Sequence, residues 1–437
     1  MKPKPMVLLS LLCFVAAVAF GQNPCSLPTT PPDPNNQTQV AQTAWQIFVA
    51  AACSTSTPTQ YPMLQWETWL EQAQVYPAAS SGASFAAAMK RGAANRFHGS
   101  PLGIVMARKQ ALAAGALPPQ LNPADCNSNP STQPGMKPSP SPICEEVRLS
   151  PTTTSYVGSP FPGATLTFRP PQARFATAGA GPFQPFFPQG GWASSNISFP
   201  TSSVEIKVDW IQYTPTCPAS LQGNVWTETY GGNCYALAGM HVISKLVPNW
   251  IWATFEPQSP ITNANRCVVL GCNDPYGSSP AQTPPNTFGA TTNITPALQQ
   301  LMTSANLNSV WQNYRLDGVQ TTFVDGSGNP VLLGNSVIEA ENANVPLTQA
   351  SCQSCHAYSS INAAGTDGIN NLPTTGNPIG TPPRNAIPAG FAARDFVWSL
   401  SMACPGSPFG NPTGPGVANC SSSTSSAKPT AAKTKKK

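Results

Sequence analysis

Charged side chains are scarce in this sequence. Asp, Glu, Lys and Arg together make up 9% of the 437 residues, against roughly 25% in an average soluble domain. Two of the lysines lie among the first four residues and five among the last ten, so the rest of the chain carries slightly more acidic than basic groups. That balance excludes an extended basic face, and we expect no nucleic-acid partner.

The sequence also lacks an apolar run long enough to cross a bilayer. Its N-terminal apolar stretch, residues 6–20, falls short of the ~20 residues that a spanning helix needs. Two lysines precede this stretch and small residues follow it, which is the pattern of a signal peptide over residues 1–21. We therefore predict a periplasmic or secreted protein without an integral membrane span.

Long helices are excluded as well, because proline is abundant. The chain contains 50 prolines, about twice the usual share. Proline lacks a backbone N–H and clashes with the preceding helical turn, so a bundle of long helices would not form. Short helices, strands and many loops are expected instead.

The order of patterns along the chain predicts an α+β fold. Helical spacing over 39–53 and 62–76, with further candidates over 85–91 and 101–116, gives an N-terminal helical part over 38–120. Strand patterns over 204–210 and 234–246 and a hairpin over 323–333 give a β-rich part over 200–335. We predict one large loop-rich domain, 22–420, with a central antiparallel sheet and then a disordered Lys-rich tail, 421–437.

Disulfides are expected to brace this loop-rich domain. Of 13 cysteines, one lies in the signal peptide and two in a motif considered next, which leaves ten. An even number in an exported chain suits five disulfides. Pairing each cysteine with its nearest neighbour predicts the bridges Cys25–Cys53, Cys126–Cys144, Cys217–Cys234, Cys267–Cys272 and Cys404–Cys420.

The chemistry of the chain is concentrated in a C-x-x-C-H motif. Cys352, Cys355 and His356 have the spacing at which two thiols add to the vinyl groups of a haem and the adjacent His binds its iron. A disulfide between the two cysteines is an alternative, whereas a zinc site would need a second Cys/His pair that the sequence lacks. We predict one covalent haem c in a C-terminal haem segment over 336–405.

The second axial ligand of the iron is left open by the sequence. Met402 follows the motif at a plausible distance, and a distal Met would raise the reduction potential. His241, in the predicted strand over 234–246, is a second candidate, although a buried hydrogen-bonded His is also common in a core. An open position or another ligand is the third possibility.

The chain resembles an uncharacterised family of exported single-haem cytochrome-c-like proteins between about residues 40 and 400. The resemblance implies covalent haem and electron transfer and names no substrate. The family often has a His directly after a Thr-Phe-Glu block, where this chain has Pro257. The shared blocks are Trp45-x-x-Phe48, Trp66-Glu67-Thr68-Trp69, Glu205-Ile206-Lys207, Gly239-Met240-His241 with Lys245, Trp250-Ile251-Trp252-Ala253-Thr254-Phe255-Glu256, the haem motif and Asp395-Phe396-Val397-Trp398.

Three functions are compatible with a single covalent haem. The first is one-electron transfer, for which we expect a redox partner protein. The second is a peroxidase-like enzyme, which needs an open iron position and an acid–base group such as His98, His241 or Glu256. The third is a module that binds or senses a small ligand. The sequence identifies no small-molecule substrate.

Overall fold

The structure is a computed structural model, and thirteen segments of the chain are described here. The predicted signal peptide, the tail, and the helix candidates over 85–91 and 101–116 lie outside these segments. The described residues are 23–54, 64–71, 126–127, 142–158, 198–230, 232–258, 270–279, 293–341, 345–362, 371–373, 377–383, 385–389 and 391–399.

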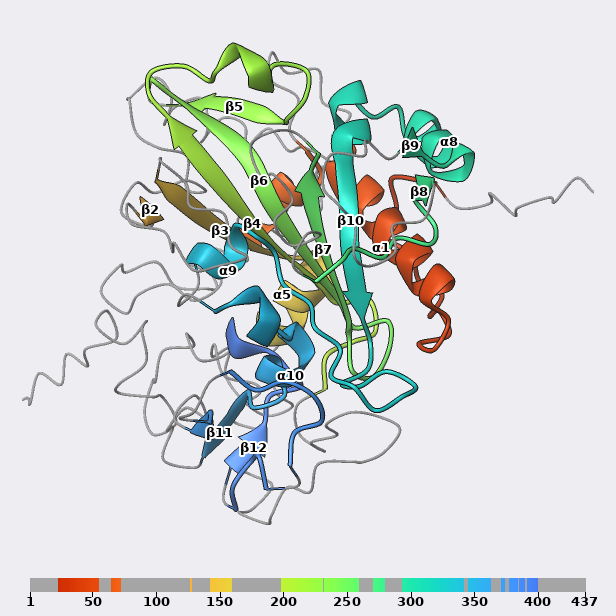
Figure 1. Cartoon of the computed structure of the whole chain (residues 1–437), viewed down its shortest axis with the longest axis vertical. Coiled ribbons are helices and arrows are strands. Elements are labelled where there is room, and N and C mark those ends of the chain that lie inside the picture. The colour runs from red at the N-terminus through yellow and green to blue at the C-terminus, as the bar shows by residue number, and fades with distance from the viewer. Residues whose placement is uncertain are drawn as a thin grey trace, which may run out of the picture.

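An eight-stranded antiparallel sheet forms the centre of the fold (Figure 1). Its main path is β1-β3-β4-β6-β7-β10, with β2 beside β3 and β5 beside β6. The pairs β5–β6 and β6–β7 join neighbouring segments, whereas β1–β3, β3–β4 and β7–β10 join segments far apart in the chain. The strands are β1 (Leu70–Glu71), β2 (Cys126–Asn127), β3 (Ile143–Leu149), β4 (Val204–Tyr213), β5 (Thr227–Tyr230), β6 (Asn233–Ser244), β7 (Ile251–Pro257) and β10 (Tyr314–Gln320).

Both faces of the sheet are covered, which explains the composition of its strands. After its first residue, β6 is buried at every position, as expected for a strand with neighbours on both sides and layers above and below. In β4, Ile206 and Val208 belong to the main apolar core, while Glu205 and Lys207 alternate with them and point to the opposite face. The sheet therefore has one apolar face and one face that carries charged side chains.

Helix α1 (Gln37–Ala52) covers the apolar face. The Asn36 side chain caps its first turn by accepting a hydrogen bond from the backbone N–H of Gln39. Trp45 and Phe48 then pack on Phe255 of β7, with ring centroids 4.9 Å and 4.6 Å away. This aromatic cluster fixes the helix against the middle of the sheet.

The C-terminal part of the chain covers the other face. It contains α9 (Ile338–Glu341), α10 (Cys352–His356) and the antiparallel pair of β11 (Ser360–Asn362) and β12 (Phe391–Ala393). These blue elements lie on a different side of the sheet from the red α1 (Figure 1). A second apolar core joins them to the sheet through side chains that include Ile243, Trp250, Trp252, Leu333 and Phe396.

Smaller elements complete the described fold. Thr295 caps α8 (Pro296–Ser304) by accepting from the backbone N–H of Leu298, and Pro296 begins the helix. Val324 and Pro330 form the single bridge of the expected turn over 323–333. The remaining elements are η1 (Trp66–Thr68), α5 (Pro151–Gly158), η4 (Ala219–Leu221), β8 (Ser278–Ser279), β9 (Asn293–Ile294), α8 (Pro296–Ser304), η5 (Ser309–Asn313) and η6 (Leu347–Gln349).

The predicted α+β class, with a single domain built on a central antiparallel sheet, is confirmed. The predicted helix over 62–76 is wrong in its described part. There the chain forms one 3-10 turn and then strand β1, in which Leu70 pairs with Leu149 and Glu71 with Arg148. Backbone pairing with β3 thus replaces the helical hydrogen bonds that the local spacing suggested.

Two of the five predicted disulfides are confirmed, Cys25–Cys53 and Cys217–Cys234. Cys144 and Cys272 are also disulfide-bonded, and Cys126 stands directly opposite Cys144 in the β2–β3 register. The other predicted partners, Cys267, Cys404 and Cys420, lie outside the described residues. Among the described helices, none is long and apolar enough to cross a membrane.

Candidate functional site

The motif helix α10 is anchored to the end of the sheet. Gln320, the last residue of β10, donates from Nε2 to Oγ of Ser351 at 2.9 Å, and its Oε1 accepts from the backbone N–H of Gln353 at 3.1 Å. Gln353 in turn donates to the carbonyl oxygen of Thr321 at 3.2 Å. The helix is five residues long, so these bonds from a rigid strand fix its direction.

The two thiols of the motif are free. Among the described cysteines, Cys352 and Cys355 carry free thiols, whereas the others on which side chains are described form disulfides. Burial raises the pKa of Cys355 to about 11 and that of Cys352 well above its ordinary value, with Glu339 adding to both effects. The structure therefore does not have the alternative Cys352–Cys355 disulfide, and both sulfurs are available.

One ring nitrogen of His356, Nδ1, is engaged in a hydrogen bond, and the other, Nε2, is left to bind a ligand. Its Nδ1 lies 2.7 Å from the carbonyl oxygen of Phe396. Because a carbonyl accepts only, Nδ1 carries the proton and Nε2 keeps a lone pair. Burial lowers the pKa of His356 to about 4, and Trp252 packs on its ring with centroids 4.5 Å apart. The side chain is thus a neutral, oriented imidazole, the form in which His binds metals.

The orientation of the Phe396 carbonyl, which binds His356, depends on an unusual backbone conformation. Asp395 and Phe396 both have positive φ, 51° and 68°, a region that non-glycine residues rarely adopt. The Asp395 carboxylate accepts from Nζ of Lys245 at 2.5 Å and from the backbone N–H of Phe199 at 2.7 Å. These buried bonds stabilise the strained segment and direct the Phe396 carbonyl towards α10.

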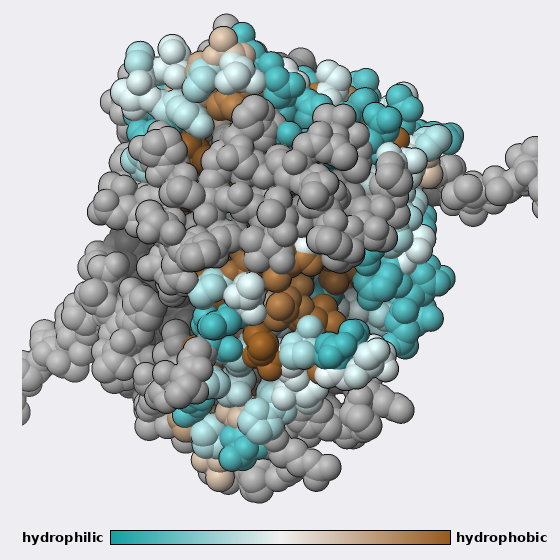
Figure 2. Space-filling model, viewed as in Figure 1, coloured by the Kyte–Doolittle hydropathy of each residue, from teal (hydrophilic) through white to brown (hydrophobic). Residues whose placement is uncertain are grey.

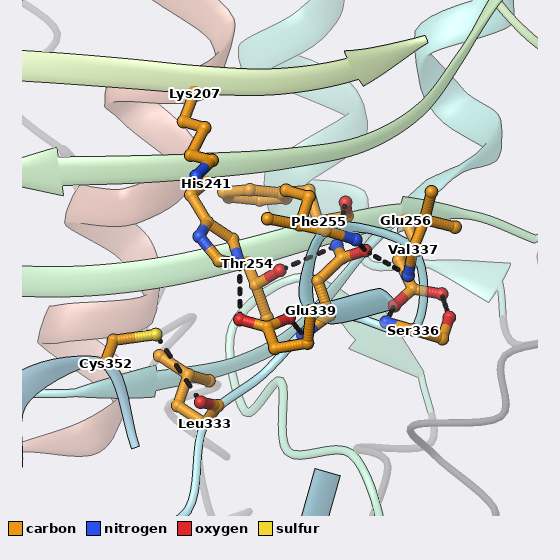
Figure 3. A network of polar contacts seen from close by, with 12 residues as sticks. Lys207, His241, Thr254, Phe255, Glu256, Leu333, Ser336, Val337, Glu339 and Cys352 are labelled. Carbon is orange, nitrogen blue, oxygen red and sulfur yellow. Dashed lines mark hydrogen bonds and ion pairs between the residues drawn. The ribbon is translucent and has the colours of Figure 1, made fainter. Parts of the chain in front are cut away.

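A polar row lies across the charged face of the sheet, beside the motif. Lys207 on β4 is paired in register with His241 on β6, which is paired with Thr254 on β7. Glu339 of α9 lies over the row, and Cys352 stands nearby (Figure 3). A ring nitrogen of His241, a carboxylate oxygen of Glu339 and the sulfur of Cys352 all lie within 4.8 Å of one another.

Asn335 links this row to α9. Its Nδ2 donates to Oγ1 of Thr254 at 2.9 Å, and its Oδ1 accepts from the backbone N–H groups of Val337 and Ile338. Its own backbone N–H donates to Oε2 of Glu339. One oxygen of that carboxylate is therefore committed, and the other faces His241.

Burial controls the charges of the row. It raises the pKa of Glu339 to about 7 and lowers that of His241 to about 3, and Lys207 acts against the charged form of His241. Burial would also lower the pKa of Lys207, but Glu145 and Asp209 outweigh it and raise the pKa.

The structure brings together four of the predicted site residues: Cys352, Cys355, His356 and His241. Met402 and His98 lie outside the described residues. Glu256 is engaged elsewhere, because its two oxygens accept from the backbone N–H and the hydroxyl of Ser336 at 2.7 Å and 2.5 Å. That arrangement disfavours Glu256 as an acid–base group.

Three groups of the site were not predicted from the sequence: the Glu339 carboxylate, the Asn335 amide and the Phe396 carbonyl. Asn is a common residue at the start of a helix, and that signal could have found Asn335. Figure 2 shows an apolar patch bordered by polar residues on the face of the molecule that is viewed. Comparisons with protein-family models, with curated proteins and with solved structures found no match. The resemblance to cytochrome-c-like proteins stays a prediction.

Proposed function

We propose that the protein is an exported monohaem c-type cytochrome, with haem attached through Cys352 and Cys355 and His356 as the proximal iron ligand. The observation that carries the proposal is the hydrogen bond from Nδ1 of His356 to the Phe396 carbonyl. It fixes the tautomer and leaves Nε2 as the only ring atom able to bind iron, which is the usual arrangement for metal-bound His.

The residues around the motif suit a haem. The two thiols lie one helical turn apart on α10 and are free. Trp252, Leu333 and Phe396 belong to the apolar core that meets the motif, and Cys352 packs at its edge. An apolar, water-poor wall of this kind is what sets the potential of a haem iron.

The chain's own groups would bind and orient the cofactor. Cys352 and Cys355 would hold it as thioethers, and His356 would donate its Nε2 lone pair. Phe396 would keep the proton of His356 at Nδ1, which makes the imidazole a stronger electron donor. When bound, the haem supplies one-electron redox chemistry at its iron. We propose electron exchange with a redox partner protein outside the cytoplasm as the use of that chemistry.

The peroxidase-like alternative needs an acid–base group over an open iron position. Glu256 is saturated by Ser336, and the carboxylate nearest His241 belongs to Glu339, which holds the start of α9. These contacts favour a carrier over an enzyme.

Covalent attachment is the test of the proposed function. The full chain is exported in a host with a c-type haem maturation system, denatured, and assayed for haem that stays with the polypeptide. We expect one haem per chain, and its loss in the double variant Cys352→Ser/Cys355→Ser. The double variant Cys217→Ser/Cys234→Ser removes a disulfide instead and should keep its haem. Haem that survives denaturation without Cys352 and Cys355 would overturn the proposal.

A further inference from the structure

The imidazole of His241 is buried in an arrangement that the fold alone does not explain. The residue lies in the middle of β6 with 7% of its surface exposed. Its Nε2 atom has no hydrogen-bond partner. The nearest carboxylate oxygen, Oε1 of Glu339, is 3.7 Å away, beyond hydrogen-bond range. A buried polar atom without a partner costs free energy, so its retention points to a role.

The groups around His241 leave its Nε2 atom without a hydrogen bond. Oε1 of Glu339 lies 3.7 Å away, and the other oxygen of that carboxylate accepts from the backbone N–H of Asn335. An imidazole nitrogen that no protein group engages has the lone pair that a metal ligand needs.

His241 and Trp252, the residue that packs on the ring of His356, lie on the same face of the sheet. Trp252, which packs on the ring of His356 at 4.5 Å, is paired in register with Ile243. Ile243 and His241 are two residues apart on β6, so their side chains share one face. His241 also has a ring nitrogen within 4.8 Å of the Cys352 sulfur. His241 is therefore two residues along β6 from Ile243, whose register partner Trp252 packs on His356.

We propose that Nε2 of His241 would bind the haem iron as its second protein ligand, in addition to His356. The inference rests on the proposed function and deepens it. A ligand on β6 is held by ladder bonds to β4 and β7 on both sides, which gives the rigid placement that a metal site needs. Two nitrogen ligands would close the iron to small molecules and give a lower potential than a Met ligand. The protein would then be an electron carrier.

Spectra of the haem-loaded full chain test the assignment. Unmodified protein should be six-coordinate, and its reduced spectrum should not change with carbon monoxide. His241→Ala should lose the six-coordinate signature and bind carbon monoxide promptly. Imidazole added to His241→Gly should restore the six-coordinate spectrum, a rescue that a purely structural role would not give. His241→Met, which keeps a ligand and an apolar shape, should raise the reduction potential.

Three further variants serve as controls. Met240→Ala removes a side chain from the same strand but on the opposite, α1-facing side, so it should lower stability and leave the spectrum unchanged. Met402→Ala and His98→Ala should also leave the spectrum unchanged. A six-coordinate His241→Ala protein, or an open iron in either Met402→Ala or His98→Ala, would overturn the assignment. Covalent haem with an unaltered His241→Ala spectrum defeats this inference alone, whereas absence of covalent haem defeats the proposed function.

Discussion

Lys245 and Asp395 form a buried ion pair, with Nζ 2.5 Å from Oδ1, at the base of the segment that holds His356. Their side chains are 9% and 1% exposed. Removing one partner of such a pair leaves an uncompensated buried charge, at a cost of about 3–5 kcal/mol. We expect Asp395→Ala to lose that much unfolding free energy in denaturant titrations.

The same variant should also disturb the haem site. Without Asp395 the Phe396 carbonyl would no longer be held in position to accept from Nδ1 of His356. His356 would then donate less electron density to the iron, so the reduction potential of haem-loaded protein should rise. Glu145→Gln is the matched control, because its pair with Lys207 is about a quarter exposed and such pairs contribute about 1 kcal/mol or less. Equal losses in the two variants would contradict a special role for Asp395.

The backbone of Gly239 lies so close to the Asn335 side chain that a larger residue would not fit at position 239. A Cβ at position 239 would lie 2.7 Å from Oδ1 of Asn335, so Gly239→Ala would displace the amide that holds α9. Overpacking of this kind costs roughly 1–3 kcal/mol. In a double-mutant cycle with Asn335→Ala, the measured losses of unfolding free energy should sum to more than that of the double variant. Strict additivity would show that the two residues do not compete for space.

Trp252 should matter both for stability and for His356. The side chain is 2% exposed and packs on the His356 ring. Trp252→Ala should cost about 3–5 kcal/mol through cavity formation, whereas Trp252→Phe should cost less because it refills most of the space. Calorimetric melting of both variants checks the order, and a larger loss in Trp252→Phe would contradict it.

The Cys25–Cys53 disulfide should stabilise the fold without affecting the site. It closes a loop with a sequence separation of 28 and ties the start of the described chain to the end of α1. Loss of a native disulfide typically costs about 2–5 kcal/mol. Cys25→Ser/Cys53→Ser should therefore unfold at lower denaturant concentration while its haem content and spectrum stay unchanged. A loss of haem in this variant would show that the Cys25–Cys53 disulfide is needed for the structure of the haem site.

Glu205 predicts a pH dependence of stability. Burial raises its pKa from 4.5 to about 7 in the folded chain, against the opposing effect of Lys207. The folded state then holds a proton that the unfolded state has released, so stability falls as pH rises from about 4.5 to 7. The pKa difference corresponds to about 3 kcal/mol.

Glu205→Gln imitates the protonated side chain and should remove this loss. Relative to the unmodified protein, the variant should be more stable above pH 7 and equally stable near pH 4. Denaturant unfolding at a series of pH values measures both profiles. Parallel profiles would show that the Glu205 carboxyl does not carry the effect.

Local patterns predicted the parts of the fold whose cause is local. Helix α1 and strand β6 follow from apolar spacing. Strand β1 was mistaken for helix because its pairing with Leu149 joins distant segments. The spacing of apolar residues carries no information on such a partner.

Some residues of the site were likewise predicted from local sequence, and others became known only from the structure. The sequence identified the cysteines and His356, whereas the groups that orient them come from elsewhere in the chain. Phe396 contributes a backbone carbonyl, which no residue type encodes, and it does so from a positive φ that Phe rarely adopts. Trp252 was visible as one of several tryptophans, but only the sheet register shows that it meets His356.

The antiparallel sheet is built entirely from residues that precede the motif, since its last strand ends at Gln320. A chain that emerges N-terminus first can therefore complete the wall of the site before Cys352 and Cys355 appear. His356 then receives its carbonyl partner only when residue 396 has followed. In a chain that folds as it emerges, the sheet therefore forms first, the two attachment cysteines follow, and the carbonyl that orients His356 comes last.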